Sequence, residues 1–548
     1  MSAETYMSKQ KIWQWITVLI LLTIAGTMFT WRVARQKDQQ MREELLEKAA
    51  LLAQAVDARC LGALTGTDTD LTMPEYLRLK EQLSLIRYDS RGCRFIYLMG
   101  RRPDGTVFFY ADSEAAGSED ESPAGQIYEE ASEILRRVFT TGRGETEGPL
   151  ADRWGTWVTA FAPIGDTKGK TASAVLGMDI EANDWRWEVT CAGFAPVLLT
   201  VTGLSVFVAS GVLFRQRGRF STRLRGWPLR YAEAVITVGI GLTSASVLVY
   251  LAHNNEIRST RIAFSQLARA ETDDVVDLMN DVRDTQLEGL ACFFEGSMDV
   301  SRQEFQIYAE HLTRGTSVQA WEWIPAIAEA DRTSCEHKAI QEGLTGFAVW
   351  QNNADGVRTP ATGRNTYYPV YYVEPFPGNE EALGYDLGSE PIHLAAFGIA
   401  AHTRLVTATD AVTLLPETRG PNDILVHRPI FAENESAQLR GFVTAVLCTE
   451  TMLRDAVGQA DCHTDMYQLK GDVPPVLLAS TWSGHTGTST TGEEHRSDYY
   501  RDLSFERPIC AFGKVYRVVS YPGPEFLATH PVRSEERRVG KECRSRGA

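Results

Sequence analysis

Three long apolar runs without a single charge most constrain what this chain can fold into. They occupy residues 13–31, 189–214 and 234–252. Each run approaches or exceeds the length that crosses a hydrocarbon core of roughly 30 Å at about 1.5 Å per residue. A buried core helix is the alternative for each run, but runs of this length without a charge favour the membrane. The sequence therefore predicts three transmembrane helices, at 13–34, 189–214 and 232–252.

A cleavable signal peptide is the alternative interpretation of the first run. Its apolar segment is longer than that of a typical signal peptide, and no small-x-small cleavage site precedes the charged segment RVARQK at residues 32–37. A Trp stands at each end of the run, where aromatic side chains gather at a membrane surface. We therefore expect the first run to remain as a membrane anchor.

The connection between the second and third runs, residues 215–231, predicts the orientation. It carries six arginines and no acidic residue: Arg215, Arg217, Arg219, Arg223, Arg225 and Arg230. Short cytoplasmic loops are enriched in Lys and Arg, so this loop and the N-terminal residues 1–12 are predicted to be cytoplasmic. Four basic residues just after the first helix oppose this orientation, but the six-arginine loop outweighs them. Residues 35–188 and 253–531 are then predicted to be extracytoplasmic.

Length and charge narrow the class further. A chain of 548 residues that is 44% hydrophobic can form two or three cored domains. Its 71 acidic and 55 basic residues give a formal net charge of -16. A strongly negative chain repels a phosphate backbone, so nucleic acid is not an expected partner.

The first outer segment, residues 35–188, begins with helix formers and then changes to a strand pattern. Residues 37–56 predict a juxtamembrane stalk helix, and strands are predicted at 94–100, 106–112, 154–164 and 172–180. A helix followed by an antiparallel sheet indicates an α+β module with one sheet face available to a ligand. This arrangement resembles the PAS-like Cache sensors that bacterial receptors hold outside the membrane.

Polar and aromatic residues on these strands are candidates for a pocket. Asp112, Trp154, Trp157 and Asp179 could line it, although exposed turn residues or ordinary core residues would give the same pattern. The nearby GDTKGKT at 165–171 nearly spells a phosphate-binding loop, but Ile164 stands where its first glycine should be. A strand also follows it instead of a helix, so we interpret it as a hairpin turn.

The second outer segment opens with a long amphipathic helix, predicted over residues 254–294. After it come, in order, VQAWEWIPAIAEADRTSCEH, GFAVW, the long stretch from RNTYYPVYYVEPF to TLLPE, and RGFVTAVL. Together these segments resemble the CHASE sensor domain of plant cytokinin receptors and many bacterial membrane receptors. The resemblance implies a periplasmic or exterior ligand sensor on a multi-pass protein of the bacterial inner membrane. The overall fold prediction is α+β, with three transmembrane helices and two extracytoplasmic PAS-like sensor modules on helical stalks.

The tripeptide Glu381-Ala382-Leu383 spells the name of a family of cyclic-di-nucleotide phosphodiesterases. Such an enzyme needs many carboxylate ligands for two metals in a barrel of roughly 250 residues. Here the tripeptide lies within the CHASE-like motif on the predicted outer face. We therefore interpret the letters as a coincidence and assign no catalytic residue, metal or cofactor.

Aromatic residues 367–372 and the polar turn that follows suggest a ligand-binding strand. The resemblance implies that the ligand lies on the sheet of a membrane-distal PAS-like half. The candidate pocket residues are Trp323, Arg364, Tyr368, Tyr371, Glu374 and Thr409. The alternative is a structural role, with Trp323 in the core and Asp386 capping the segment. Glu374-Pro375 stands where plant receptors place an adenine-reading Asp, so a small molecule other than cytokinin, or a short peptide, is expected.

Nine cysteines allow no disulfide pairing to be deduced, and Cys462 beside His463 lacks a second ligand pair for a metal. Residues 532–548 form a dense basic tail that resembles translated sequencing-adaptor read-through. The resemblance to CHASE receptors predicts a homodimeric fragment of a sensor histidine kinase. The input region of a diguanylate cyclase and a stand-alone membrane-anchored binding protein are the alternatives.

Overall fold

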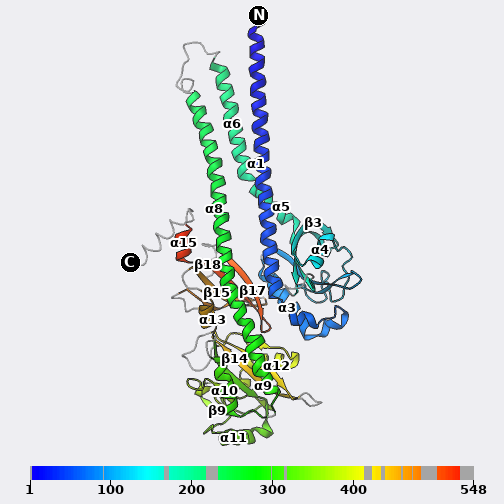
Figure 1. Ribbon diagram of the computed structural model, residues 1–548, viewed down its shortest axis with the longest axis vertical. Helices are drawn as coiled ribbons and strands as arrows, with labels where there is room; N and C mark the ends of the chain where they lie inside the picture. Colours follow the sequence, from blue (N-terminus) through cyan, green and yellow to red (C-terminus); the bar gives the residue numbers. More distant parts are fainter. Residues whose placement is uncertain are drawn as a thin grey trace, which may run out of the picture.

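The computed structural model describes most of the chain. The described residues are 3–90, 92–165, 172–217, 232–297, 299–313, 317–353, 355–412, 422–432, 438–457, 461–471, 473–482 and 503–530. The predicted turn at 165–171, most of the arginine-rich loop and the tail at 532–548 therefore lie outside the described residues. Figure 1 shows an elongated molecule in which three long helices extend from one end and the sheets gather at the other.

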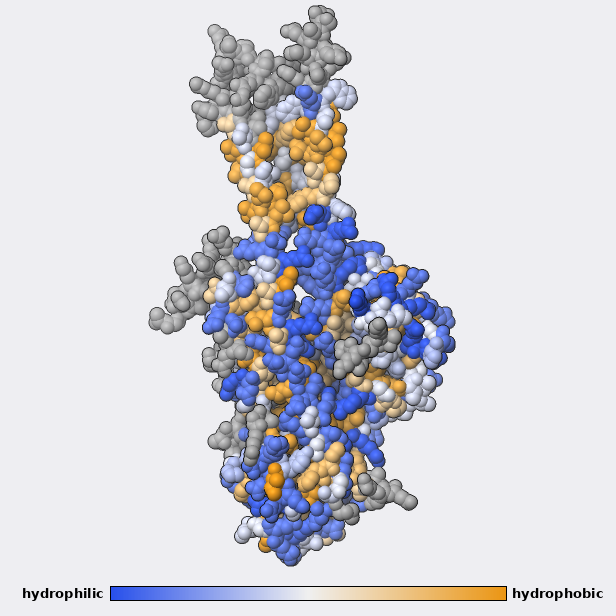
Figure 2. Space-filling view, viewed as in Figure 1, coloured by the Kyte–Doolittle hydropathy of each residue, from blue (hydrophilic) through white to orange (hydrophobic). Residues whose placement is uncertain are grey.

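The three long helices carry the predicted apolar runs. They are α1 (Ala3–Ala55), α6 (Phe194–Arg217) and α8 (Ala232–Asp281), with α5 (Ala182–Ala192) leading into α6. Figure 2 shows an apolar band around the part of the bundle that extends beyond the sheets. Two described helical stretches are long and apolar enough to cross a membrane, Trp13–Ala55 and Ala182–Val212. The third predicted span, in α8, is not among them and stays a prediction.

The first module is a five-stranded antiparallel sheet in the order β2-β1-β5-β4-β3. Its strands are β1 (Cys93–Arg101), β2 (Val107–Asp112), β3 (Glu145–Asp152), β4 (Gly155–Ile164) and β5 (Ala174–Glu181). Four of these strands were predicted. The sequence analysis missed β3, whose hydrophilic segment ETEGPLAD has no apolar alternation.

Helices cover both faces of this sheet. The stalk end of α1, α2 (Ala58–Ala63) and α3 (Pro74–Asp89) share one core with residues such as Ile96 and Leu176. Helix α4 (Glu133–Thr141) packs on the opposite face against Tyr97 and Phe161. Alternate residues of each strand therefore face two separate cores, as the pleat requires.

The second outer segment contains two larger sheets, stacked along the molecule (Figure 1), and two small two-stranded sheets. The membrane-distal sheet has the order β11-β6-β14-β13-β12. Its strands are β6 (Val318–Pro325), β11 (Tyr372–Glu374), β12 (Thr407–Ala408), β13 (Ile424–Phe431) and β14 (Leu439–Leu447). This sheet is surrounded by four helices: α9 (Glu288–Glu295), α10 (Arg302–Thr313), α11 (Arg332–Gln341) and α12 (Pro391–Thr403). Two small strand pairs also lie around it: β7 (Ile327–Ala328) with β10 (Thr366–Tyr367), and β8 (Trp350–Asn352) with β9 (Arg358–Pro360).

The membrane-proximal sheet has the order β16-β15-β18-β17. Its strands are β15 (Cys462–Lys470), β16 (Val473–Ser480), β17 (Phe505–Ala511) and β18 (Lys514–Pro522), accompanied by α13 (Thr449–Ala456) and α15 (Pro524–Thr529). Helix α8 runs along both sheets and continues through a π-helical segment, Val282–Leu287, into α9. This continuous path confirms the predicted stalk at 254–294.

The predicted single strand of alternating aromatics is wrong in one respect. Tyr367 belongs to β10 and Tyr372 to β11, in two different sheets. Pro369 lies between them, and proline has no N–H to contribute to a continuous ladder. The distal sheet is therefore entered only at Tyr372, the first residue of β11, after a break at the proline.

The first module packs against the membrane-proximal sheet. Side chains of β15, β17 and β18, including Leu469 and Val515, join the core that also contains Leu79 and Leu83 of α3. At the rim, Arg517 forms an ion pair of 2.9 Å with Asp89. The two outer segments, which residues 189–252 separate in the sequence, thus share one hydrophobic core.

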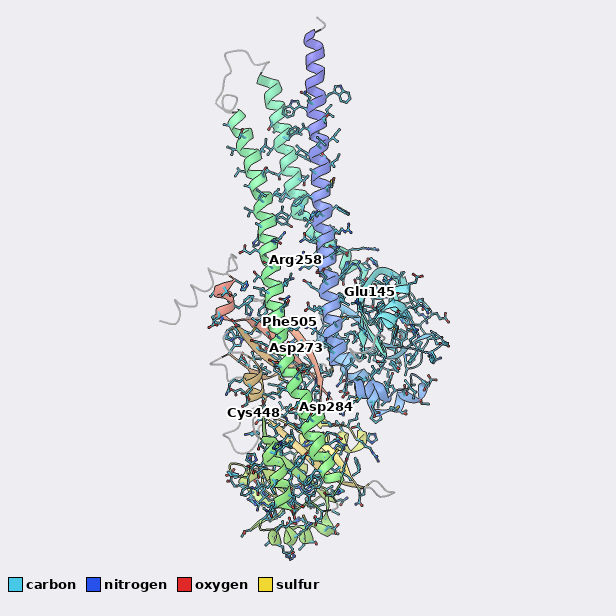
Figure 3. The ribbon with its side chains drawn as sticks, viewed as in Figure 1. Glu145, Arg258, Asp273, Asp284, Cys448 and Phe505 are labelled. Atoms are coloured by element: carbon cyan, nitrogen blue, oxygen red, sulfur yellow. The ribbon has the colours of Figure 1, made fainter. Side chains whose placement is uncertain are left out.

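Helix α8 and its π-helical continuation form ion pairs with the membrane-proximal sheet and with the first module. Asp273 on α8 pairs with Arg507 of β17, and Figure 3 shows Asp273 level with Phe505 on that strand. At the π-helical segment, Asp284 forms an ion pair of 2.9 Å with Arg59 of the first module. Both outer modules therefore contact the helix that leads to the third predicted membrane span.

Candidate ligand-binding clefts

The first module contains an open cleft of about 330 Å³ on the α4 side of its sheet. Its lining is aromatic and acidic: Phe95, Tyr97, Met99, Phe109, Asp112, Asp120, Ser122, Tyr128, Asp152, Trp154 and Asp179. Three residues predicted from the sequence, Asp112, Trp154 and Asp179, come together here. Trp157 lies behind them, where its Nε1 donates to Asp152 Oδ1 at 3.0 Å.

Asp179 stands on β5 in the floor of this cleft and is only 4% exposed. Its Oδ1 accepts hydrogen bonds from the Thr159 hydroxyl at 2.6 Å and the Tyr97 hydroxyl at 3.2 Å. The pKa of this carboxyl is raised to about 7, chiefly by burial. The two hydrogen bonds oppose the rise, and the nearby carboxylates Asp152 and Glu147 add to it. Asp179 is therefore poised to change charge near neutral pH.

A close contact orients Tyr97 toward Asp179. Tyr97 on β1 faces Gly177 on β5 across the ladder, and its ring occupies the space above that glycine. A Cβ on Gly177 would lie 2.1 Å from Cε2 of Tyr97. Because position 177 has no side chain, the Tyr97 ring can pack directly against the backbone of the sheet.

Aromatic rings form the wall of the cleft. Phe109 lies at the centre, with ring centroids 5.6 Å from Tyr97, 5.6 Å from Tyr128 and 6.1 Å from Trp154, all edge to face. Asp152 fixes the turn that carries Trp154, because its Oδ1 accepts from the backbone N–H groups of Trp154 and Gly155 at 2.9 and 3.1 Å. The wall is therefore built by side chains from four separate segments: β1, β2, the loop that carries Tyr128 and the turn that carries Trp154.

Asp112 connects the cleft to α3. Lys80 of α3 donates to Asp112 Oδ1 at 2.7 Å and forms an ion pair with Glu121 at 2.8 Å. Burial lowers the pKa of Lys80, but the hydrogen bonds that its ammonium group donates to these two carboxylates outweigh it and hold the pKa above its usual value. Asp112 therefore forms an internal ion pair with Lys80 at the edge of the cleft.

A second cleft, of about 250 Å³, lies at the β11 edge of the distal sheet. Its lining residues are Arg302, Phe305, Gln306, Leu344, Tyr371, Tyr372, Val373, Glu374, Phe376 and Leu383. Of the six residues predicted for this region, the structure brings Tyr371 and Glu374 together here. Burial, with the nearby Glu310, raises the pKa of Glu374. The hydroxyl of Tyr372 is already engaged, because it donates to Glu342 at 2.8 Å.

The other four predicted residues lie elsewhere in the distal half. Trp323 stacks on Phe294 with ring centroids 4.1 Å apart, on the stalk side of the sheet. Tyr368 packs against Phe397 of α12, with centroids 5.0 Å apart. Thr409 is buried at the edge strand, where its hydroxyl accepts from the Leu425 N–H at 3.1 Å.

Arg364 belongs to a buried ion pair. Its guanidinium lies 2.8 Å from Asp386, which is fully buried and also accepts from the Tyr368 N–H at 2.8 Å. Asp386 also caps a short helical turn through the Gly388 N–H. This pair holds the segment between the distal sheet and α12 in place and does not line either cleft.

Sequence reasoning missed Tyr97, Tyr128 and Asp152 in the first cleft and Arg302 in the second. Tyr97 could have been found from strand alternation, since it shares a face with Phe95 and Met99. Tyr128 and Asp152 had no such signal, because one lies in a loop and the other ends the strand that was missed. Within the described residues no group of three or more His, Cys, Asp or Glu side chains could hold a metal ion, and all eight described cysteines are free.

Comparison with known protein families identifies the second module. Residues 298–478 match the CHASE domain family. The chain therefore contains a CHASE domain, a sensory domain that receptors carry outside the membrane, and the sequence-based recognition of it is confirmed. A comparison with curated proteins found no significant match.

Solved structures with partial likeness are sensory domains. An extracellular ligand-binding receptor from Desulfohalobium retbaense is 10% identical with a TM-score of 0.26, covering 49% of this chain, which spans 40% of that receptor. The GABA-bound ligand-binding domain of the amino-acid chemoreceptor PctC of Pseudomonas aeruginosa is 11% identical with a TM-score of 0.29, covering 48% of this chain and 98% of that domain. The periplasmic sensory domain of the Campylobacter jejuni chemoreceptor Tlp1 is 9% identical with a TM-score of 0.27, covering 52% and 97%. With TM-scores this low, we draw nothing from them.

Proposed function

We propose that this chain is the ligand-sensing input region of a bacterial transmembrane receptor with two extracytoplasmic sensors. The observation that carries the proposal is the position of the two clefts: each lies in a module that packs on a helix continuous with an apolar run. The first cleft sits on the sheet that covers α1, and the CHASE domain surrounds the stalk of α8. A ligand that shifts either sheet would act directly on a helix that enters the membrane.

The orientation proposed is the one expected from the sequence. The N-terminal end of α1, the C-terminal end of α6 and the N-terminal end of α8 lie together, and both modules lie at the opposite end of the bundle (Figure 1). This arrangement supports a cytoplasmic loop 215–231, with residues 35–188 and 253–531 in the periplasm or exterior. A sensor histidine kinase is the output that we propose for the parent protein, acting as a homodimer. A diguanylate cyclase and a stand-alone membrane-anchored binding protein remain the alternatives.

Cysteine labelling in intact cells tests the topology. A membrane-impermeant maleimide should react, above the background of the native cysteines, with Cys introduced at Ser118 or Asp355, both of which are exposed. It should fail to react with Cys at Thr222 until the cells are opened. Labelling at residue 222 alone in intact cells would refute the proposed orientation.

A further inference from the structure

The charges around the first-module cleft are unbalanced. Four of its lining residues are aspartates, and no Lys or Arg lines it. Two of these carboxylates have cationic partners: Lys80 pairs with Asp112, and Arg94 pairs with Asp120 at 2.6 Å. Each of those cations is shared with a second acid, Glu121 for Lys80 and Glu114 for Arg94. The protein's own cations therefore do not offset the negative charge of the cleft.

Asp152 and Asp179 have only neutral donors. The hydrogen bonds to Asp152 come from two backbone N–H groups and the Trp157 indole, and all of them reach Oδ1. The bonds to Asp179 come from two hydroxyls, and both also reach Oδ1. Among the described residues nothing is bonded to Oδ2 of Asp179, although this side chain is more than nine-tenths buried in the cleft floor. Oδ2 is not among the fully buried unpartnered oxygens of the described residues, so from the cleft floor it can accept a hydrogen bond from a ligand or face a ligand cation.

The aromatic wall suits the same kind of ligand. Tyr97, Phe109, Tyr128 and Trp154 surround the space in front of these carboxylates, and ring faces attract cations, especially a desolvated ammonium group. The outer rim already shows one such contact, since the Arg153 guanidinium lies 4.9 Å from the Trp154 ring centroid. Arg153 is itself held by both oxygens of Glu130, which does not line the cleft.

From this combination we infer that the first-module cleft binds an organic cation, a primary amine or quaternary ammonium group enclosed by the aromatic wall and facing Asp179 and Asp152. The inference rests on the proposed sensing function, because it names the ligand class of that same cleft. An anionic ligand would meet four carboxylates. A neutral ligand would leave Asp179 without a counter-charge. The raised pKa of Asp179 agrees with this, because a bound cation would favour its charged form.

Isothermal titration calorimetry on the purified full chain in a non-ionic detergent tests the inference. The probes are tetramethylammonium chloride and butylammonium chloride, compared with neutral tert-butanol and with sodium butyrate. The cations should bind saturably and the other two should not. Asp179→Asn, which keeps the shape of the side chain, and Trp154→Phe, which keeps one aromatic ring but removes the rest of the indole face, should each weaken cation binding by about tenfold or more. Glu374→Gln, a matched change in the CHASE cleft, should leave it within about twofold.

The possible results separate the inference from the proposed function. Cation binding that survives both Asp179→Asn and Trp154→Phe would place the site elsewhere and overturn the inference. Binding of butyrate or tert-butanol that Trp154→Phe weakens, without binding of either cation, would also overturn it while leaving a sensing role for the cleft intact. If none of the four probes binds to a chain whose melting curve is intact, the ammonium assignment fails, and the labelling experiment still decides the topology on its own.

Discussion

Replacing Lys80 by Met should destabilise the first module far more than the surface position of most lysines suggests. The Lys80 side chain is only 10% exposed and lies 2.7 Å from Asp112 and 2.8 Å from Glu121, whose side chains are 6% and 12% exposed. Removing one partner of a buried ion pair typically costs about 3–5 kcal/mol, because a charge is left buried without compensation. Methionine keeps the length of the side chain, so the loss measures charge more than volume.

Proton uptake limits this cost. At pH 7 a stranded carboxyl can escape by binding a proton, and protonating a carboxyl of ordinary pKa, about 4, at pH 7 costs about 4 kcal/mol at 1.36 kcal/mol per pH unit. The two estimates agree, so we expect a loss of about 4 kcal/mol at pH 7. In the variant the folded pKa of the stranded carboxyl lies above its unfolded value. The penalty should therefore shrink as the pH falls toward 5.

Hydrogen exchange of the full chain in detergent micelles measures the loss locally, because the amides of β1 and β2 report the opening free energy of this module. Lys338→Met is the matched control. Lys338 also makes a 2.7 Å ion pair, with Asp299, but the two side chains are 50% and 73% exposed, so its loss should cost under about 1 kcal/mol. The triple change Lys80→Met, Asp112→Asn, Glu121→Gln should recover much of the stability. A Lys80→Met penalty below about 1 kcal/mol, or one that does not change with pH, would refute the reasoning.

Two further predictions concern the module contact and the cleft floor. Arg78 of α3 donates to the Val406 carbonyl at 2.9 Å and to the Thr407 hydroxyl at 3.0 Å. Arg78→Ala should therefore weaken the docking of the first module by about 2–4 kcal/mol and speed proteolysis at that contact. The control Arg136→Ala, on the exposed face of α4, should change neither the docking nor the proteolysis. Asp179 has a folded pKa of about 7, raised by burial, so its contribution to stability should fall as the pH rises from about 4 through 7. Asp179→Asn should flatten this dependence in the exchange of the β5 amides, and an unchanged pH profile would contradict it.

The three long helices and four of the five strands of the first sheet could be predicted from the sequence because their signals are local. An uncharged run about as long as the hydrocarbon core is thick, as in α1 and α6, and a short apolar run such as FIYLM in β1 are each formed by residues close together in the sequence. The CHASE domain was recognised in the same way, from the order of its segments. Strand β3 was missed for the corresponding reason, since ETEGPLAD has no local pattern to read.

The sites depended on the tertiary structure. Asp112, Trp154 and Asp179 were chosen by residue type, but only the antiparallel order β2-β1-β5-β4-β3 places them around one cleft. Arg364 and Trp323 matched a binding pattern equally well, yet folding gave Arg364 a buried carboxylate partner and gave Trp323 a stacked phenylalanine. The docking of α3 on β15 and β18 joins segments hundreds of residues apart. The sequence specifies the polarity and size of each side chain. Which residue a side chain contacts depends on which distant surfaces can bury their apolar area together.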